Sequence, residues 1–292
     1  VEGGTATVFL PNGGTLELSG TISNASSLAD QLVTISSGSK GRISASRLTS
    51  RNAPGAFDVD GMKLGSYTVT AGVQVYEQVD GGAMVNLGLN HLDLDQIPAD
   101  KIAAYHLNTS DMVDYIVLEA VTGNAYEYGM MVSSSTTERV PVDGTGEDGG
   151  EVEYEDKTTE TWSLVNSGRI DFAPQYGYGG KNGDFVGIAV GKNRENKNTI
   201  KSVIQLRKVE NVAPSDFFES QGVTYVNAGG RTYRVSDDVE CYRSISSNRF
   251  SQDNWFAQDT GAERLNACKA FSNDLTIYID PIGEQVRIVQ AN

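Results

Sequence analysis

The stretch that decides the fold lies at the end of the chain. It reads Tyr233-Arg-Val-Ser-Asp-Asp-Val-Glu-Cys-Tyr242 and, further on, Leu275-Thr-Ile-Tyr-Ile-Asp-Pro-Ile-Gly-Glu-Gln-Val-Arg-Ile-Val289. A diverged copy precedes it: Tyr67-Thr-Val-Thr-Ala-Gly-Val-Gln-Val-Tyr76, followed by Ile102-Ala-Ala-Tyr105 and Val113-Asp-Tyr-Ile-Val117. Self-similarity of this kind indicates an internal repeat.

The two copies align at offsets that only grow along the chain, as small loop insertions would cause. The offsets are 213 − 53 = 160, then 233 − 67 = 166, then 278 − 105 = 173. Chance matches would not keep this order, so we predict a tandem duplication with units of residues 1–121 and 122–292. The matched positions are Ala53, Pro54 and Phe57 with Ala213, Pro214 and Phe217; Tyr67, Val69, Val73, Val75 and Tyr76 with Tyr233, Val235, Val239, Cys241 and Tyr242; and Tyr105, Val113 and Ile116 with Tyr278, Val286 and Val289.

Short runs of threonine, valine and tyrosine alternate with turn residues throughout the sequence, which is typical of many short strands. The step Asn12-Gly13 predicts a hairpin between residues 5–10 and 14–19. Helical signals are short, the best being residues 262–270. We therefore predict a mainly β chain of two related antiparallel β-barrel or sandwich units with a few short helices. Each unit is long enough to bury its own core.

One segment of the second unit is acidic, rich in glycine and poor in apolar residues. It runs from Val140 to Asp156 and cannot bury enough surface to offset the cost of ordering. We expect a mobile loop over about residues 139–158, between a strand at 125–132 and its hairpin partner at 159–165.

The charge balance excludes some partners. A net charge of −15 in 292 residues is unsuited to nucleic acid or to an anionic membrane surface. No apolar run is long enough to insert into a membrane, and no basic-then-apolar leader begins the chain. An acidic excess is common on secreted and cell-surface proteins. The start at Val1 without methionine suggests a processed protein or, as we favour, a fragment of a longer one.

Motifs that carry catalysis or bind cofactors are matched only superficially. Gly144-Thr-Gly-Glu-Asp-Gly149 fits a dinucleotide pattern, but its carboxylates would repel phosphate and no helix follows. Ser37-x-x-Lys40 lacks the accompanying motifs of penicillin-binding enzymes. His91 and His106 are the only histidines, and no G-x-S-x-G surrounds a serine. We therefore predict no catalytic residues, no cofactor and no metal centre.

The two cysteines, Cys241 and Cys268, both fall in the second copy. The first copy has Val75 where the second has Cys241, which indicates a core position. We expect free buried thiols, with a Cys241–Cys268 disulfide as the alternative. Two histidines and two cysteines in separate units give no zinc spacing.

A few residues remain as candidates for ligand binding. Asp58-Val-Asp60-Gly61 and the 143–156 segment could hold incidental Ca²⁺, although neither has EF-hand spacing. Asp93 and Asp95 could serve as a glycosidase acid pair. Trp162 and the glycine-rich segment that carries Tyr176 and Tyr178 could present aromatic faces to a glycan or peptide.

The two-block pattern resembles repeat modules of large envelope proteins of Firmicutes, notably proteins that carry S-layer homology (SLH) domains. Those modules show Y-x-V-x-x-x-V-x-V-Y and then L-T-x-Y-x-D-x-x-G-x-V-R-x-I-x-A. The resemblance is clearest over residues 64–120 and 230–292. The first copy departs from the pattern at Asn108 and Ser110, opposite Pro281 and Gly283, and at Asp114 in place of arginine. The wall-binding SLH domains themselves are not in this chain.

The resemblance implies a non-catalytic, extracellular module of a bacterial cell-surface, S-layer-associated protein, acting as spacer or display unit. Its partners would be cell-envelope components or other copies of the surface protein. The alternatives are a glycan- or peptide-binding adhesion module and a glycoside hydrolase.

Overall fold

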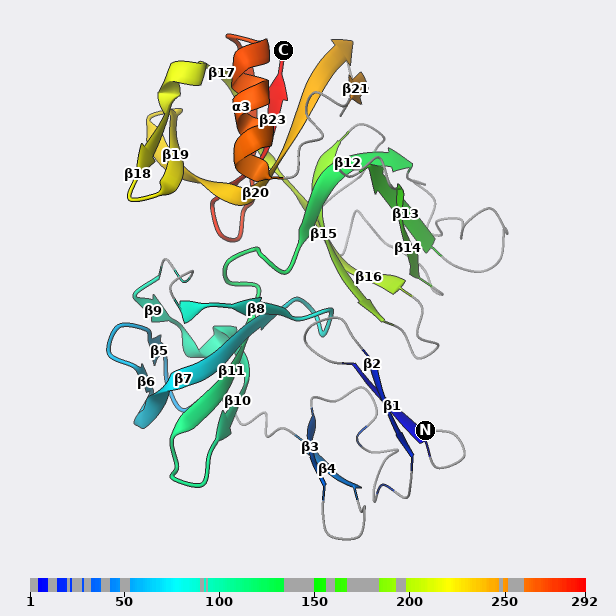
Figure 1. Cartoon of the computed structure of the whole chain (residues 1–292), viewed down its shortest axis with the longest axis vertical. Helices are drawn as coiled ribbons and strands as arrows, with labels where there is room; N and C mark the ends of the chain where they lie inside the picture. Colours follow the sequence, from blue (N-terminus) through cyan, green and yellow to red (C-terminus); the bar gives the residue numbers. More distant parts are fainter. Residues whose placement is uncertain are drawn as a thin grey trace. The chain divides into compact units, whose positions relative to one another are not determined.

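A computed structural model gives the fold, and the chain divides into two compact units, Val1–Ala125 and Tyr126–Asn292 (Figure 1). Each unit is described by itself. The structure describes residues 5–9, 15–19, 22, 28, 33–37, 43–47, 53–89, 92, 94–133, 150–155, 161–166, 184–192, 198–246, 249–251 and 260–292. Strands dominate these residues, as predicted, and the boundary falls four residues after the predicted one at residue 121.

The first unit begins with two antiparallel hairpins. Strand β1 (Thr5–Phe9) pairs with β2 (Thr15–Ser19), and β3 (Val33–Ser37) pairs with β4 (Ile43–Arg47). The strands on either side of the Asn12-Gly13 step lie where the sequence predicted them.

The rest of the first unit is one seven-stranded sheet in the order β10-β11-β7-β6-β5-β9, with β8 paired to β7. The 3₁₀ turn η3 (Ala99–Lys101) lies where Pro98 predicted a helical turn. The strands are β5 (Phe57–Asp58), β6 (Lys63–Leu64), β7 (Tyr67–Gln78), β8 (Val85–Leu87), β9 (Gln96–Ile97), β10 (Ile102–Leu107) and β11 (Val113–Glu119).

The second unit opens with a five-stranded antiparallel sheet in the order β14-β13-β12-β15-β16. Strand β13 lies inside the segment predicted to be a loop, because Val152 and Tyr154 alternate with glutamates and so give a strand period. The predicted pairing of 125–132 with 159–165 is also wrong, since β13 lies between those strands. The strands are β12 (Glu127–Ser133), β13 (Gly150–Glu155), β14 (Thr161–Asn166), β15 (Phe185–Lys192) and β16 (Asn198–Gln205).

A seven-stranded sheet completes the second unit in the order β17-β22-β23-β20-β19-β18, with β21 paired to β20. The helix α3 (Gly261–Phe271), orange in Figure 1, packs against β20 and β23. It begins at Thr260, whose hydroxyl accepts the Glu263 amide in a capping box. The other elements are β17 (Arg207–Val212), η4 (Pro214–Asp216), β18 (Phe217–Ser220), β19 (Val223–Ala228), β20 (Arg231–Ser246), β21 (Arg249–Ser251), β22 (Leu275–Ile279) and β23 (Val286–Ala291).

Each of the two seven-stranded sheets contains one parallel pair of strands, and the two pairs have the same register. Among the described strand pairs, only β7–β11 and β20–β23 are parallel, so the predicted antiparallel sheets need this one correction. Both ladders also break at the same place, after their first pair. The corresponding pairs are Val69–Val113 with Val235–Val286, Gln74–Tyr115 with Glu240–Ile288, and Val75–Ile116 with Cys241–Val289.

The strands before the parallel pair also correspond. Phe57 lies opposite Leu64, and Leu64 opposite Tyr67, across β5, β6 and β7. Phe217, Val226 and Tyr233 make the same chain of neighbours across β18, β19 and β20. Five matched residues of the first copy therefore occupy the ladder positions of their counterparts, namely Phe57, Tyr67, Val69, Val75 and Tyr76 with Phe217, Tyr233, Val235, Cys241 and Tyr242.

One sequence match is shifted by a residue. Tyr105 lies opposite Ile116 in β11, whereas the residue opposite Val289 in β23 is Ile277, not Tyr278. A bulge between Ile102 and Ala104 causes the shift. Tyr105 consequently packs in the core of the first unit, while Tyr278 lies on the opposite face of its sheet.

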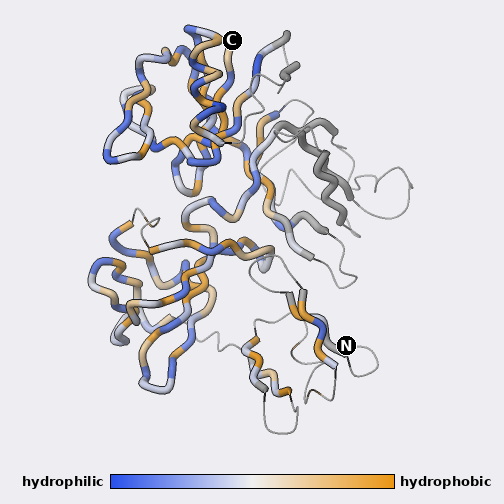
Figure 2. The backbone as a smooth tube through the Cα atoms, in the orientation of Figure 1, coloured by the Kyte–Doolittle hydropathy of each residue, from blue (hydrophilic) through white to orange (hydrophobic). Residues whose placement is uncertain are grey.

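Each seven-stranded sheet has its own core, and apolar residues (orange in Figure 2) alternate with hydrophilic ones along its strands. In the second unit, the face of the seven-stranded sheet opposite this core is also buried. Phe185 of β15 packs on Tyr242 and Tyr278, with ring centroids 4.8 and 4.6 Å away. Burial, reinforced by the negative charges of Glu210 and Asp184, raises the pKa of Tyr278 above its ordinary value.

Candidate functional site

The structure describes only part of the residues that the sequence singled out for ligand binding. Trp162 lies on β14, with its main chain opposite Tyr154 of β13. Tyr176 and Tyr178 lie outside the described residues, as do His91 and Asp93. Asp95, the other member of the acid pair, is exposed at the surface. Of these candidates, Trp162 belongs to the second unit and Asp95 to the first.

Asp58, one of the carboxylates considered for calcium, has a structural partner. Asp58 Oδ1 accepts the Gly61 amide at 2.7 Å and so closes the turn between β5 and β6. His106 Nδ1 lies 2.6 Å from Asp114 Oδ1, a cross-strand pair on a half-exposed face. Across the described parts of the chain, no three His, Cys, Asp or Glu residues form a metal-binding group.

Strands β18, β19 and β20 carry an aromatic and polar surface that was not predicted from the sequence. We call this surface the outer meander face. Because side chains alternate along a strand, Phe217 points into the core and Phe218 points outward. Phe218 is 41% exposed and stacks on Tyr225, its cross-strand neighbour, with ring centroids 5.6 Å apart. Arg234 is the next residue across, opposite Tyr225 on β20.

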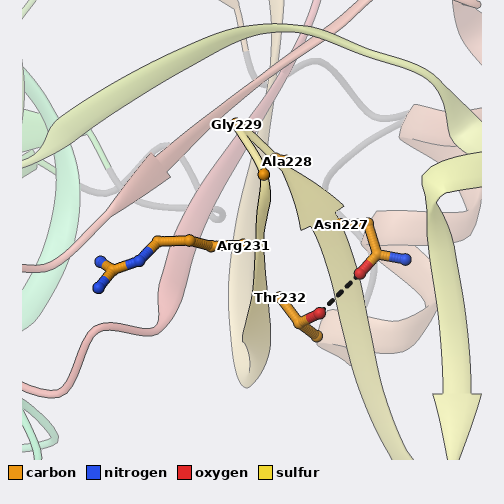
Figure 3. Close-up of a pocket in the computed structure, with 6 residues that line it drawn as sticks. Asn227, Ala228, Gly229, Arg231 and Thr232 are labelled. Atoms are coloured by element: carbon orange, nitrogen blue, oxygen red, sulfur yellow. Dashed lines mark hydrogen bonds between the residues drawn. The ribbon is translucent and has the colours of Figure 1, made fainter.

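A shallow hollow of about 320 Å³ lies at one end of this face (Figure 3). It is formed by the β19–β20 hairpin, whose turn needs positive φ at Gly229 and Gly230. Thr232 donates a hydrogen bond to Asn227 at 2.7 Å, while the Arg231 side chain points away from that pair. The residues that line the hollow supply hydrogen-bonding groups from Asn227, Arg231 and Thr232, which can contact a polar ligand.

The most elaborate polar arrangement of the first unit is structural. Glu77 is fully buried on β7, and its carboxylate accepts hydrogen bonds from the segment that leaves the unit. The hydroxyl of Thr122 donates at 2.5 Å, and five successive amides complete the cradle. These are the amides of Val121, Thr122, Gly123, Asn124 and Ala125, at 2.5–3.3 Å. This carboxylate attaches residues 121–125 to the first unit, which explains where the boundary lies.

The signature residues of the second copy surround another buried carboxylate. Asp280 Oδ1 accepts the amides of Ile282 and Gly283, and Oδ2 receives Arg287 Nε at 2.6 Å. Arg287 also donates to Ser236 at 3.2 Å, and its guanidinium lies 4.8 Å from the ring centroid of Tyr128. The aspartate, glycine and arginine of the pattern thus hold the β22–β23 turn and join the two sheets of this unit.

In the first copy Asn108 performs the turn-capping part of this role. Its Oδ1 accepts the amides of Ser110 and Met112 at 2.9 and 3.1 Å. Asn108 therefore corresponds to Asp280 and not, as the sequence alignment placed it, to Pro281. The same one-residue shift that moves Tyr105 accounts for the difference.

Both cysteines are free and buried in the core between β20 and α3, as the sequence favoured. Burial, together with a hydrogen bond that the Cys241 thiol donates to the side chain of Cys268, raises the pKa of Cys241 well above its ordinary value. A thiol in this environment is a poor nucleophile.

No helix in the described ranges has the length and apolar character required to cross a bilayer. Comparison of the chain with protein-family models, with curated proteins and with solved structures gave no match.

Proposed function

We propose that this chain is a non-catalytic, extracellular module of a bacterial cell-surface, S-layer-associated protein and acts as a spacer or display unit. The observation that carries the proposal is the shared register of β7–β11 and β20–β23, which supports a tandem repeat of one self-contained fold. The residues that correspond between the copies fill cores and turns. Repeats conserved in this way extend a chain and need no active site.

A spacer requires that each unit fold on its own. We expect residues 1–125 and 126–292, expressed separately, to unfold cooperatively in urea with the midpoints that they show in the full chain. If either piece fails to fold without the other, the two units depend on each other for folding and the proposed spacer function is refuted.

The location has its own test. Protease treatment and surface biotinylation of intact cells that carry the parent protein should modify this stretch, with a cytoplasmic enzyme as the unmodified control. Protection of the stretch in intact cells and modification only after lysis would refute an extracellular role.

The outer meander face favours a second candidate, a glycan- or peptide-binding adhesion module. A stacked aromatic pair beside amide, hydroxyl and guanidinium groups supplies the contacts that sugars and peptides need. A glycan and peptide array should then show binding that is lost in Phe218→Ala/Tyr225→Ala. It should be retained in Leu94→Ala, a control that removes an apolar side chain of similar exposure. Binding lost instead in Trp162→Ala or Tyr176→Ala/Tyr178→Ala would place the site on the residues proposed from sequence.

A further inference from the structure

The core of the second unit contains two thiols that come from different elements. Cys241 lies on β20 and Cys268 on α3, and the side chain of each has no exposed surface. They are members of one core cluster, and the two elements that carry them pack directly on each other. The Cys268 thiol also lies 3.9 Å from the carbonyl oxygen of Val289 on β23, the strand next to β20.

The surroundings hold this helix face against the sheet. Arg264, one turn before Cys268, is fully buried and donates from Nε to the Val239 carbonyl at 2.9 Å. At the start of the helix, Gly261 packs so closely on β20 that a Cβ there would lie 2.2 Å from the Asp237 carbonyl oxygen. The two elements that carry the thiols are therefore held together by contacts of Gly261 and Arg264 with β20.

We propose that Cys241 and Cys268 form a latent disulfide site, which covalently joins α3 to β20 when a disulfide oxidant such as oxidised glutathione is supplied. One cysteine thiolate attacks a sulfur of glutathione disulfide and releases one glutathione. The second cysteine thiolate then attacks the protein sulfur of the mixed disulfide and releases the other. Two thiol protons leave, two electrons pass to the oxidant, and one protein S–S bond forms.

The disulfide can form only after a local opening of the core exposes the two thiols. Complete burial denies the oxidant access, and few thiolates form at neutral pH because burial opposes ionisation. The reaction rate should therefore rise in urea below the unfolding transition, where α3 separates transiently from β20. Once formed, the bond closes a loop of 268 − 241 = 27 residues and restricts the unfolded chain.

The first unit supplies the matched control. Val75 occupies the ladder position of Cys241, opposite Ile116 where Cys241 lies opposite Val289. Cys241→Val therefore places in the second unit the side chain that the equivalent core already accepts. Cys268→Ala removes the partner thiol instead.

The test treats the full chain with oxidised glutathione in sub-denaturing urea, followed by intact-mass measurement and thermal unfolding. We expect the wild type to lose the mass of two hydrogens and to gain on the order of 5–10 °C in the unfolding midpoint of the second unit. A thiol reductant should reverse both changes, and neither single variant should show them. The proposal is overturned if the wild type stays a dithiol in urea that exposes its thiols to a small reagent. It is equally overturned if the wild type only accumulates glutathione adducts or linked dimers, or if the closed form is no more stable.

Discussion

Asp280 and Arg287 form an ion pair inside the second unit, with Oδ2 and Nε 2.6 Å apart and side-chain exposures of 0% and 4%. Removing one member leaves the other charge buried, which costs about 3–5 kcal/mol in comparable pairs. We therefore expect Asp280→Ala to lower the free energy of unfolding of the second unit by about that amount, measured by urea denaturation.

The control for this variant is the pair between Arg231 and Glu284, whose charged atoms lie 3.6 Å apart and whose side chains are more than 60% exposed. Because solvent screens it, Arg231→Ala should change the stability by less than about 0.5 kcal/mol. Equal effects of the two substitutions would show that the buried pair has no special role.

The cradle around Glu77 leads to a second prediction. Glu77→Ala removes the buried carboxylate that accepts from the amides of residues 121–125, and we expect it to destabilise the first unit by about 2–4 kcal/mol. Hydrogen exchange should show those amides losing protection first. Glu119→Ala, which removes an acceptor of the Asp80 amide and of Gln78 at the surface, should cost about 1 kcal/mol or less.

A small carboxylate offers a direct check of this geometry. Formate added to Glu77→Ala should raise its unfolding midpoint by occupying the cradle, and it should leave the wild type unchanged. Unaltered protection of residues 121–125 in Glu77→Ala would contradict the assignment.

The contrast between these two carboxylates shows what the sequence could predict. Asp280 lies in a turn with proline and glycine nearby, so the turn itself was predictable from local sequence, although the alignment with the first copy is wrong by one residue there. Glu77 is one glutamate at the end of a strand, and its partners lie 44–48 residues further along the chain. No local sequence pattern predicts these contacts, because only the folded sheet brings the amides to Glu77.

The strands were predicted where alternation is regular and missed where other features dominate. β1, β2 and α3 lie within one residue of their predicted ranges. β13 was missed because its glutamates obscured a clear strand period. The outer meander face could have been found from Phe217-Phe218, since two adjacent aromatic residues on a strand must point to opposite faces.

Tyr115 provides a pH-dependent prediction for the first unit. Burial, and after it the neighbouring Tyr76, raises the pKa of Tyr115 to about 12 from the ordinary 10. The folded state then keeps this proton at a pH where the unfolded chain has lost it, so stability is fully present below pH 10 and falls as the pH rises toward 12. Tyr115→Phe should weaken this alkaline loss of stability.

An ultraviolet titration of tyrosinate in the native protein should detect the late-titrating group, which disappears in Tyr115→Phe. In Tyr76→Phe the pKa of Tyr115 should fall only slightly, because burial is the larger cause. Ordinary titration of Tyr115 near pH 10 would show that the stacked rings of Tyr76 and Tyr115 are open to solvent.

The approach of α3 to β20 gives the last prediction. At Gly261 an added Cβ would lie 2.2 Å from the Asp237 carbonyl oxygen and 2.9 Å from the Val239 amide, both backbone atoms that cannot move aside cheaply. Alanine favours a helix over glycine by roughly 1 kcal/mol, but forcing atoms into a packed interior costs about 1–3 kcal/mol or more. We expect the steric cost to dominate, so Gly261→Ala should destabilise the second unit.

Gly72→Ala on β7 is the matched control, because nothing lies within 4 Å of its added methyl group and its φ is not positive. That variant should be neutral or slightly stabilising, by up to about 1 kcal/mol. A stabilised Gly261→Ala would mean that the helix start stands further from β20, and the contact between the two thiols beyond it would then lose its support.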